Sequence, residues 1–87
     1  MGALADIRKA AGYNTLLAAS KALKVSRSHL EQLERGIGAA SSDLQGRMEA
    51  TYDVTRQAIR HALASDALAR AESRLRQARA VSATLTP

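Results

Sequence analysis

Cysteine, phenylalanine and tryptophan are absent from this chain of 87 residues, and Tyr13 and Tyr52 are its only aromatic side chains. Without cysteine the chain can form no disulfide, no thiolate nucleophile and no cysteine-based zinc site, which suits a reducing cytoplasm. No apolar run approaches the length that spans a bilayer, and the first residues show no signal-peptide pattern. We therefore expect a cytoplasmic protein that has no membrane partner.

Groups that could form a catalytic or metal-binding centre are also scarce. His29 and His61 are the only histidines, and neither has a carboxylate at a spacing that would orient its ring. The serines occur where helices are expected to start, and no glycine-rich phosphate loop follows a strand pattern. We expect no enzyme activity, no metal, no cofactor and no small-molecule ligand.

Basic residues outnumber acidic ones: 13 Lys and Arg against 8 Asp and Glu give a formal net charge of +5. With an isoelectric point near 10.5, this composition favours a polyanionic partner, nucleic acid before an anionic membrane. The length allows one small domain. Its apolar residues are mostly small or aliphatic, so self-association would add buried surface that a lone monomer lacks.

The segment 15–36 predicts two helices joined by a tight turn. Its apolar and small residues follow helical spacing up to the corner at Val25, and the pattern then resumes with Leu30 and Leu33. Ser26 is suited to cap the second helix, because its hydroxyl can accept from the free N–H groups of the first turn. The side chains left to point outward are those of Arg27, Ser28, Glu31, Gln32 and Arg35. Such a projecting polar rod fits the major groove of DNA.

Residues 2–11 predict a first helix, with Arg8 and Lys9 on its outer side. Asn14 or Thr15 then caps the helix that follows. The free N–H groups at that helix start, together with the helix dipole, favour a phosphate.

A linker at residues 36–41 leads to a fourth helix. Ser42 begins a capping box in which the Gln45 side chain reaches back to the N–H of the cap. Its inner face is formed by three residues spaced by four: Leu44, Met48 and Tyr52. This spacing predicts a helix that packs on the core along one side.

The sequence at 54–56 repeats the corner at 25–27, 29 positions earlier, and opens a fifth helix at 55–64. Two interpretations stay open: any capped helix after a valine corner looks alike, or the chain holds a second helix-turn-helix. Glu49 counts against the second, because it occupies the place of Ser20 in the first pair and a carboxylate is costly to bury there. One observation favours the helix at 55–64 as the DNA-reading helix: its outward side carries no acid, whereas the helix at 26–35 carries Glu31 and Glu34. The second-choice DNA-reading residues are Thr55, Arg56, Gln57 and Arg60.

A last helix is expected to start with Ser65 as its cap and Asp66 beside its N-terminus. Its apolar stripe has alternating spacings of four and three: Ala64, Leu68, Ala71, Leu75, Ala78, Ser82 and Leu85. The stripe either folds back on its own domain or forms a two-fold dimer contact. We favour the dimer, because the preceding helices already provide enough partners for a core; the expected dimerisation residues are Leu68, Ala71, Leu75 and Ala78. Residues 80–87 are expected to fray.

The stretch ALKVSRSHLEQLERG at 22–36 resembles the helix-turn-helix of the phage repressor/Cro family, and Glu34-Arg35-Gly36 resembles the end of the third helix in many members. The similarity extends over about residues 4–63. It implies an all-α fold, a small bundle of about five helices, with the helix-turn-helix domain at 1–64. Residues 65–87 would form a C-terminal helix for dimerisation or packing, and a tail.

The resemblance also implies roles for individual residues. Arg27, Ser28 and Gln32 would read base edges, since arginine can bind guanine and glutamine adenine through two hydrogen bonds each. Phosphate contacts, which set the register on the duplex, would come from Asn14, Thr15, Ser26 and Arg35.

These implications lead to two functional hypotheses. The first is a sequence-specific transcriptional regulator, a homodimeric repressor of a phage, plasmid or other mobile element, which binds double-stranded DNA at an inverted-repeat operator. The second is a protein-binding helical adaptor or antitoxin that holds another protein through the Ala/Leu stripe of residues 64–85.

Overall fold

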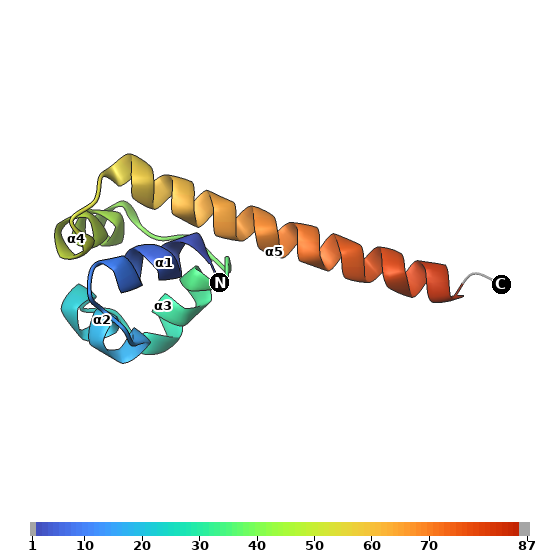
Figure 1. Ribbon diagram of the computed structural model, residues 1–87, viewed down its shortest axis with the longest axis horizontal. Helices are drawn as coiled ribbons and strands as arrows, with labels where there is room; N and C mark the ends of the chain where they lie inside the picture. The colour runs from blue at the N-terminus through green and yellow to red at the C-terminus, as the bar shows by residue number, and fades with distance from the viewer. Residues whose placement is uncertain (1, 86–87) are drawn as a thin grey trace.

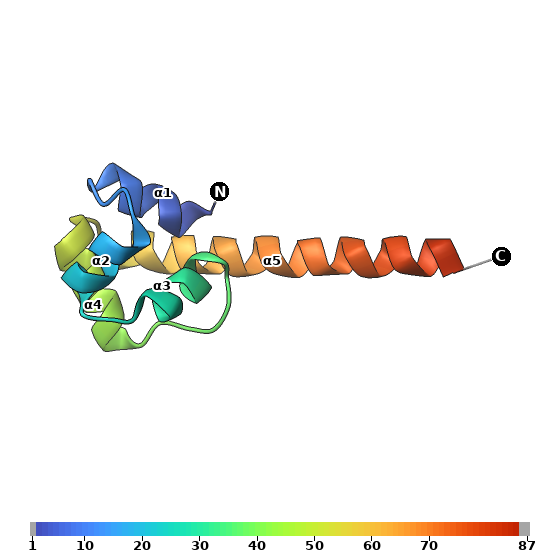
Figure 2. The same cartoon turned by 90° about the horizontal axis from the view of Figure 1, so that it is seen from below.

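The computed structural model describes the backbone of residues 2–85 and the side chains of residues 2–79, and it is all-α over that range. In Figures 1 and 2 the first four helices gather around one end of the fifth, whose other end projects from this body. The helices are α1 (Ala3–Ala10), α2 (Leu16–Leu23), α3 (Arg27–Glu34), α4 (Ser42–Tyr52) and α5 (Arg56–Leu85). The predicted small helical bundle is confirmed. None of the helices in the described part of the chain combines the length and apolar character needed to cross a membrane.

The core is built from aliphatic side chains that every helix contributes. The largest fully buried ones are Leu4, Leu23, Leu30, Leu33, Met48 and Ile59. Each of these stabilises the fold by about 1.5–3 kcal/mol relative to an exposed position. The inner face predicted for α4 is confirmed, because Leu44, Met48 and Tyr52 are all buried.

Side-chain hydroxyls cap α2, α3 and α4. Thr15 accepts from the N–H of Ala18 at 3.2 Å, and Ser26 accepts from that of His29 at 3.1 Å, as expected. The capping box predicted for α4 is wrong by one residue: Ser41 is the cap, and Gln45 donates to a carbonyl oxygen before it. Ser41 is the last residue with an extended backbone before α4, and Ala40 before it is buried.

The break expected at Ser65 is absent, because α5 runs without interruption from Arg56 to Leu85. No glycine or proline lies between these residues, so nothing in the sequence stops the helix. The expected domain boundary at 64/65 thus falls inside α5. Contrary to expectation, Asp66 does not lie at the N-terminus of its own helix. Its carboxylate accepts from the N–H groups of Ala3 at 2.6 Å and Leu4 at 3.0 Å, and so caps α1.

Three parts of the chain meet at Asp66. The start of α1 approaches so closely that a Cβ atom added to Gly2 would lie 2.8 Å from the carboxylate. From the other side Gly36, just past α3, lies against the backbone of Asp66, and its φ of 79° is one that glycine adopts at little cost. Asp66 therefore holds α1, α3 and α5 together.

Beyond Asp66 the helix leaves the body, and the side chains of residues 71–79 are all exposed. Leu68 is 60% exposed and Leu75 51%. The interpretation that this helix folds back on its own domain is therefore wrong for the described part. Of the predicted stripe, Ser82 and Leu85 lie outside the described side chains. The backbone of the end expected to fray is helical as far as Leu85, and residues 86–87 lie outside the described part.

We predict that Asp66→Ala lowers the free energy of unfolding by about 1–3 kcal/mol, because two N–H groups at the start of α1 lose a charged acceptor. Urea denaturation followed by circular dichroism measures this change. Ser65→Ala, at an exposed neighbouring position, should stay within about 0.5 kcal/mol of the wild type. Equal stabilities of the two variants would contradict the role of Asp66.

Candidate nucleic-acid interface

The turn between α2 and α3 sets how α3 is presented. Lys24 ends α2 in the left-handed conformation, with φ 59°, and the N–H of Val25 donates to the Ser20 carbonyl at 3.1 Å. Val25 packs against the core, and the buried Ala19 and Ser20 are small enough for the two helices to approach closely. The predicted valine corner is confirmed.

A residue that no sequence pattern singled out supports this turn. Arg47 of α4 donates from Nη1 to the carbonyl oxygens of Leu23 at 2.8 Å and Lys24 at 3.3 Å, which are at the end of α2. Its Nη2 also pairs with Asp43 one turn earlier, at 2.7 Å. A cation at these carbonyls suits the negative end of the α2 dipole.

The C-terminal end of α3 is held by a buried ion pair. Arg8 donates to both carboxylate oxygens of Glu34, at 2.8 and 3.3 Å, and to the carbonyl oxygen of Tyr13 at 2.8 Å. The two charged side chains are only 7% and 8% exposed. The outward position predicted for Arg8 is therefore wrong: the carboxylate and the carbonyl supply the partners that let a guanidinium be buried. Burial, together with the negative charge of Glu34, raises the pKa of the adjacent Tyr52.

With both ends of α3 fixed, its polar side is left open. Arg27, Ser28 and Gln32 are exposed, and within the described residues no hydrogen bond or ion pair engages their side chains. Leu30 and Leu33 lie on the opposite side in the core. The expected base-reading residues thus lie on the accessible side of α3.

The four expected phosphate-binding residues are also exposed. Thr15 and Ser26 use their hydroxyl oxygens as cap acceptors, which leaves each hydroxyl hydrogen available to a phosphate. Asn14 lies next to the start of α2, and Arg35 is the residue that ends α3.

The corner between α4 and α5 has the same backbone geometry as that between α2 and α3. Asp53 has φ 54°, close to the value at Lys24, and the N–H of Val54 donates to the Glu49 carbonyl at 3.3 Å. Thr55 caps α5 by accepting from the N–H of Ala58 at 3.1 Å. The sequence repeat therefore corresponds to a repeated structural turn.

The side chains at this second corner are nevertheless occupied. Arg56 pairs with Glu49 at 2.5 Å and also donates to Ser42, while Arg60 donates to Gln45 at 3.4 Å. Glu49 is one-third exposed and paired, so it does not carry the burial cost expected for it. Of the second-choice DNA-reading side chains, that of Gln57 is left without a partner in the described part of the chain.

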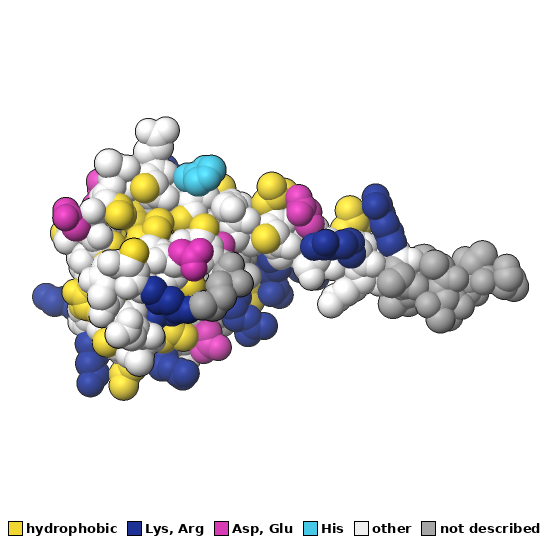
Figure 3. Space-filling model, viewed as in Figure 1, with side chains coloured by type: hydrophobic (Ala, Val, Ile, Leu, Met, Phe, Trp, Pro, Cys, Tyr) yellow, Lys and Arg dark blue, Asp and Glu magenta, His cyan; other side chains and the backbone are white. Residues whose placement is uncertain are grey.

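Figure 3 shows Lys and Arg side chains along the lower edge of the body, over α2 and beside α3, and again along the projecting part of α5. Comparisons of the chain with models of protein families, with curated proteins and with solved structures found no match. The case for a function therefore rests on the chemistry and geometry of these residues.

We predict that Arg8→Ala lowers the free energy of unfolding by about 3–5 kcal/mol, because Glu34 would be left buried without its partner. Arg56→Ala removes a pair that is one-third exposed and should cost less than about 1 kcal/mol. Chemical denaturation of both variants provides the comparison. Similar losses in the two would show that burial does not distinguish these ion pairs.

Proposed function

We propose that the protein is a sequence-specific DNA-binding transcriptional regulator that reads its operator with α3. The observation that carries this proposal is the contrast between two helices that follow the same turn. On α3, Arg27 and Gln32 are exposed and unengaged among the described residues, whereas Arg56 and Arg60 on α5 are bound to α4. A side chain that reads a base edge must be free to reach it.

In this proposal some exposed residues on and around α3 contact bases and others contact phosphates. Arg27 binds a guanine and Gln32 an adenine, each through two hydrogen bonds, and Ser28 contacts either. Asn14, Thr15, Ser26 and Arg35 contact phosphates and fix the register. Of the two acids of α3, Glu34 is neutralised inside the body by Arg8, which weakens the electrostatic objection to this helix. The further assignment as a repressor of a mobile element rests on the resemblance alone.

A dimer completes the proposal. From Asp66 to Leu85 the helix extends about 28 Å, with Leu68 and Leu75 exposed. A helix surrounded by water lacks the packing from which helices in proteins gain most of their stability. A second copy can cover the stripe of both chains in one two-fold contact. Two copies of α3 would then read the halves of an inverted repeat.

The same exposed leucines also favour the alternative of a helical adaptor or antitoxin, in which a different protein covers the stripe. The two functions differ in their response to salt. DNA binding weakens steeply as salt rises, because phosphate contacts release counterions, whereas apolar docking does not.

We predict that Arg27→Ala loses about 1–3 kcal/mol of discrimination between the selected operator and random duplex. Arg56→Ala, at the equivalent position after the second turn, should discriminate as the wild type does. Gel-shift titrations on duplexes selected by the wild-type protein from a random pool measure both. The opposite result, with the loss confined to Arg56→Ala, would assign the reading to α5.

We predict that the double variant L68E/L75E is monomeric at concentrations where the wild type is a dimer, because the stripe would carry like charges on both copies. Gln77→Glu places an acid on the other side of α5 and should remain dimeric. Sedimentation equilibrium distinguishes these states. A wild-type protein that is monomeric throughout the concentration range would contradict dimerisation through α5.

A further inference from the structure

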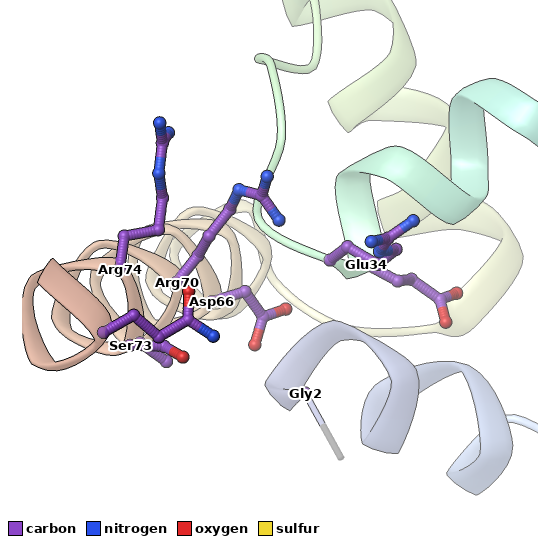
Figure 4. A pocket seen from close by; sticks show the side chains of 9 residues that line it. Gly2, Glu34, Asp66, Arg70, Ser73 and Arg74 are labelled. Carbon is purple, nitrogen blue, oxygen red and sulfur yellow. The ribbon is translucent and has the colours of Figure 1, made fainter. Parts of the chain in front are cut away.

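A groove lies where α5 leaves the body, between α5, the start of α1 and the end of α3. Its volume is about 660 Å³. In Figure 4 Arg70 extends from α5 toward α3, Arg74 projects from α5 away from the start of α1, and Asp66 and Glu34 lie nearer the body. The polar side chains of its walls are two acids, three arginines and two uncharged residues: Glu34, Asp66, Arg35, Arg70, Arg74, Ser73 and Gln77.

The charges of this groove are unequally engaged. Both acids have partners: Glu34 accepts from Arg8, and Asp66 accepts from two N–H groups of α1. In the part of the chain with described side chains, no hydrogen bond or ion pair engages Arg35, Arg70 or Arg74. The groove therefore presents three unpaired guanidinium groups and no unpaired carboxylate, an arrangement that suits phosphate oxygens.

The groove is continuous with the polar side of α3. At about 100° per residue, Arg35 lies roughly 80° around the helix from Arg27, between Arg27 and Gln32. Arg35 thus belongs both to the face proposed to read bases and to the wall of the groove. A polyanion bound along α3 would reach the arginines of α5 without leaving this surface, which favours nucleic acid over an isolated acidic peptide.

We propose that Arg70 and Arg74, together with Arg35, bind phosphates of the DNA backbone next to the segment that α3 reads. This inference rests on the proposed function and extends its interface to a helix that has no part in base reading. The contacts add affinity that is independent of sequence, because phosphates carry no base information.

The two sides of α5 allow this contact and the dimer to coexist. Arg70 lies roughly 160° around the helix from Leu68, whereas Arg74 lies roughly 60° from Ala71 and borders the stripe. A second copy that covers the stripe would therefore leave Arg70 open. Arg76 is exposed on the same stretch of helix but does not line the groove.

The test compares two single variants of the full chain with equal net charge, R70Q and R76Q. Binding to operator and to random-sequence duplex is measured over a range of salt concentrations. For R70Q we expect the slope of log K against log salt to fall in magnitude by about 0.9 per chain, the value for one phosphate contact. Binding to operator and to random duplex should weaken by the same factor, while R76Q keeps the wild-type slope.

Equal slopes for R70Q and R76Q would overturn the inference, and if Arg27→Ala still lost discrimination, the proposed function would stand. A wild-type protein that binds no duplex would overturn both. Circular dichroism and sedimentation of each variant confirm that folding and assembly are unchanged, so that a change in slope reports the phosphate contacts.

Discussion

The arrangement of this protein depends on one buried carboxylate. Asp66 accepts the two N–H groups that open α1, and its own backbone lies against Gly36 at the end of α3. The acceptor lies in the first half of α5, which continues through this junction without a break. The part of α5 before Asp66 contributes Ile59 and Ala62 to the core, and the part after it leaves the body. The basic groove lies at this junction, and the exposed stripe extends beyond it.

The candidate interface is defined by which polar side chains are already engaged. The corners after α2 and α4 have nearly the same backbone, with Lys24 and Asp53 in the left-handed conformation. At the second corner, Gly46 leaves space for the Arg56 guanidinium, which pairs with Glu49. At the first corner no comparable acid lies on α2, and the side chains of Arg27, Ser28 and Gln32 on α3 have no partner within the described chain. Two similar turns therefore lead to helices with different surfaces: these polar side chains of α3 are available to a ligand, whereas the arginines at the start of α5 are bound to α4.

Helix α5 separates two kinds of chemistry around its axis. The exposed leucines on one side stabilise an assembly only when they are buried against another apolar surface. The arginines on the groove side stabilise a complex by contact with anions. The two acids beside them, Glu34 and Asp66, are already bound to Arg8 and to the start of α1. In the proposed complex one side is occupied by a second chain and the other by DNA. The second chain thus contacts the apolar side of α5, and the DNA phosphates contact its arginines.

The first four helices, the caps of α2 and α3 and the inner face of α4 could be predicted from the amino-acid sequence, because these features depend on residues within a few positions of one another. The length of α5 and the contacts between distant residues became visible only in the folded chain. Arg8 looked like a surface residue until Glu34, 26 positions away, was placed beside it. Asp66 looked like the start of a new helix, yet it caps α1. A local pattern shows which groups a segment offers, and only the fold shows which of them meet.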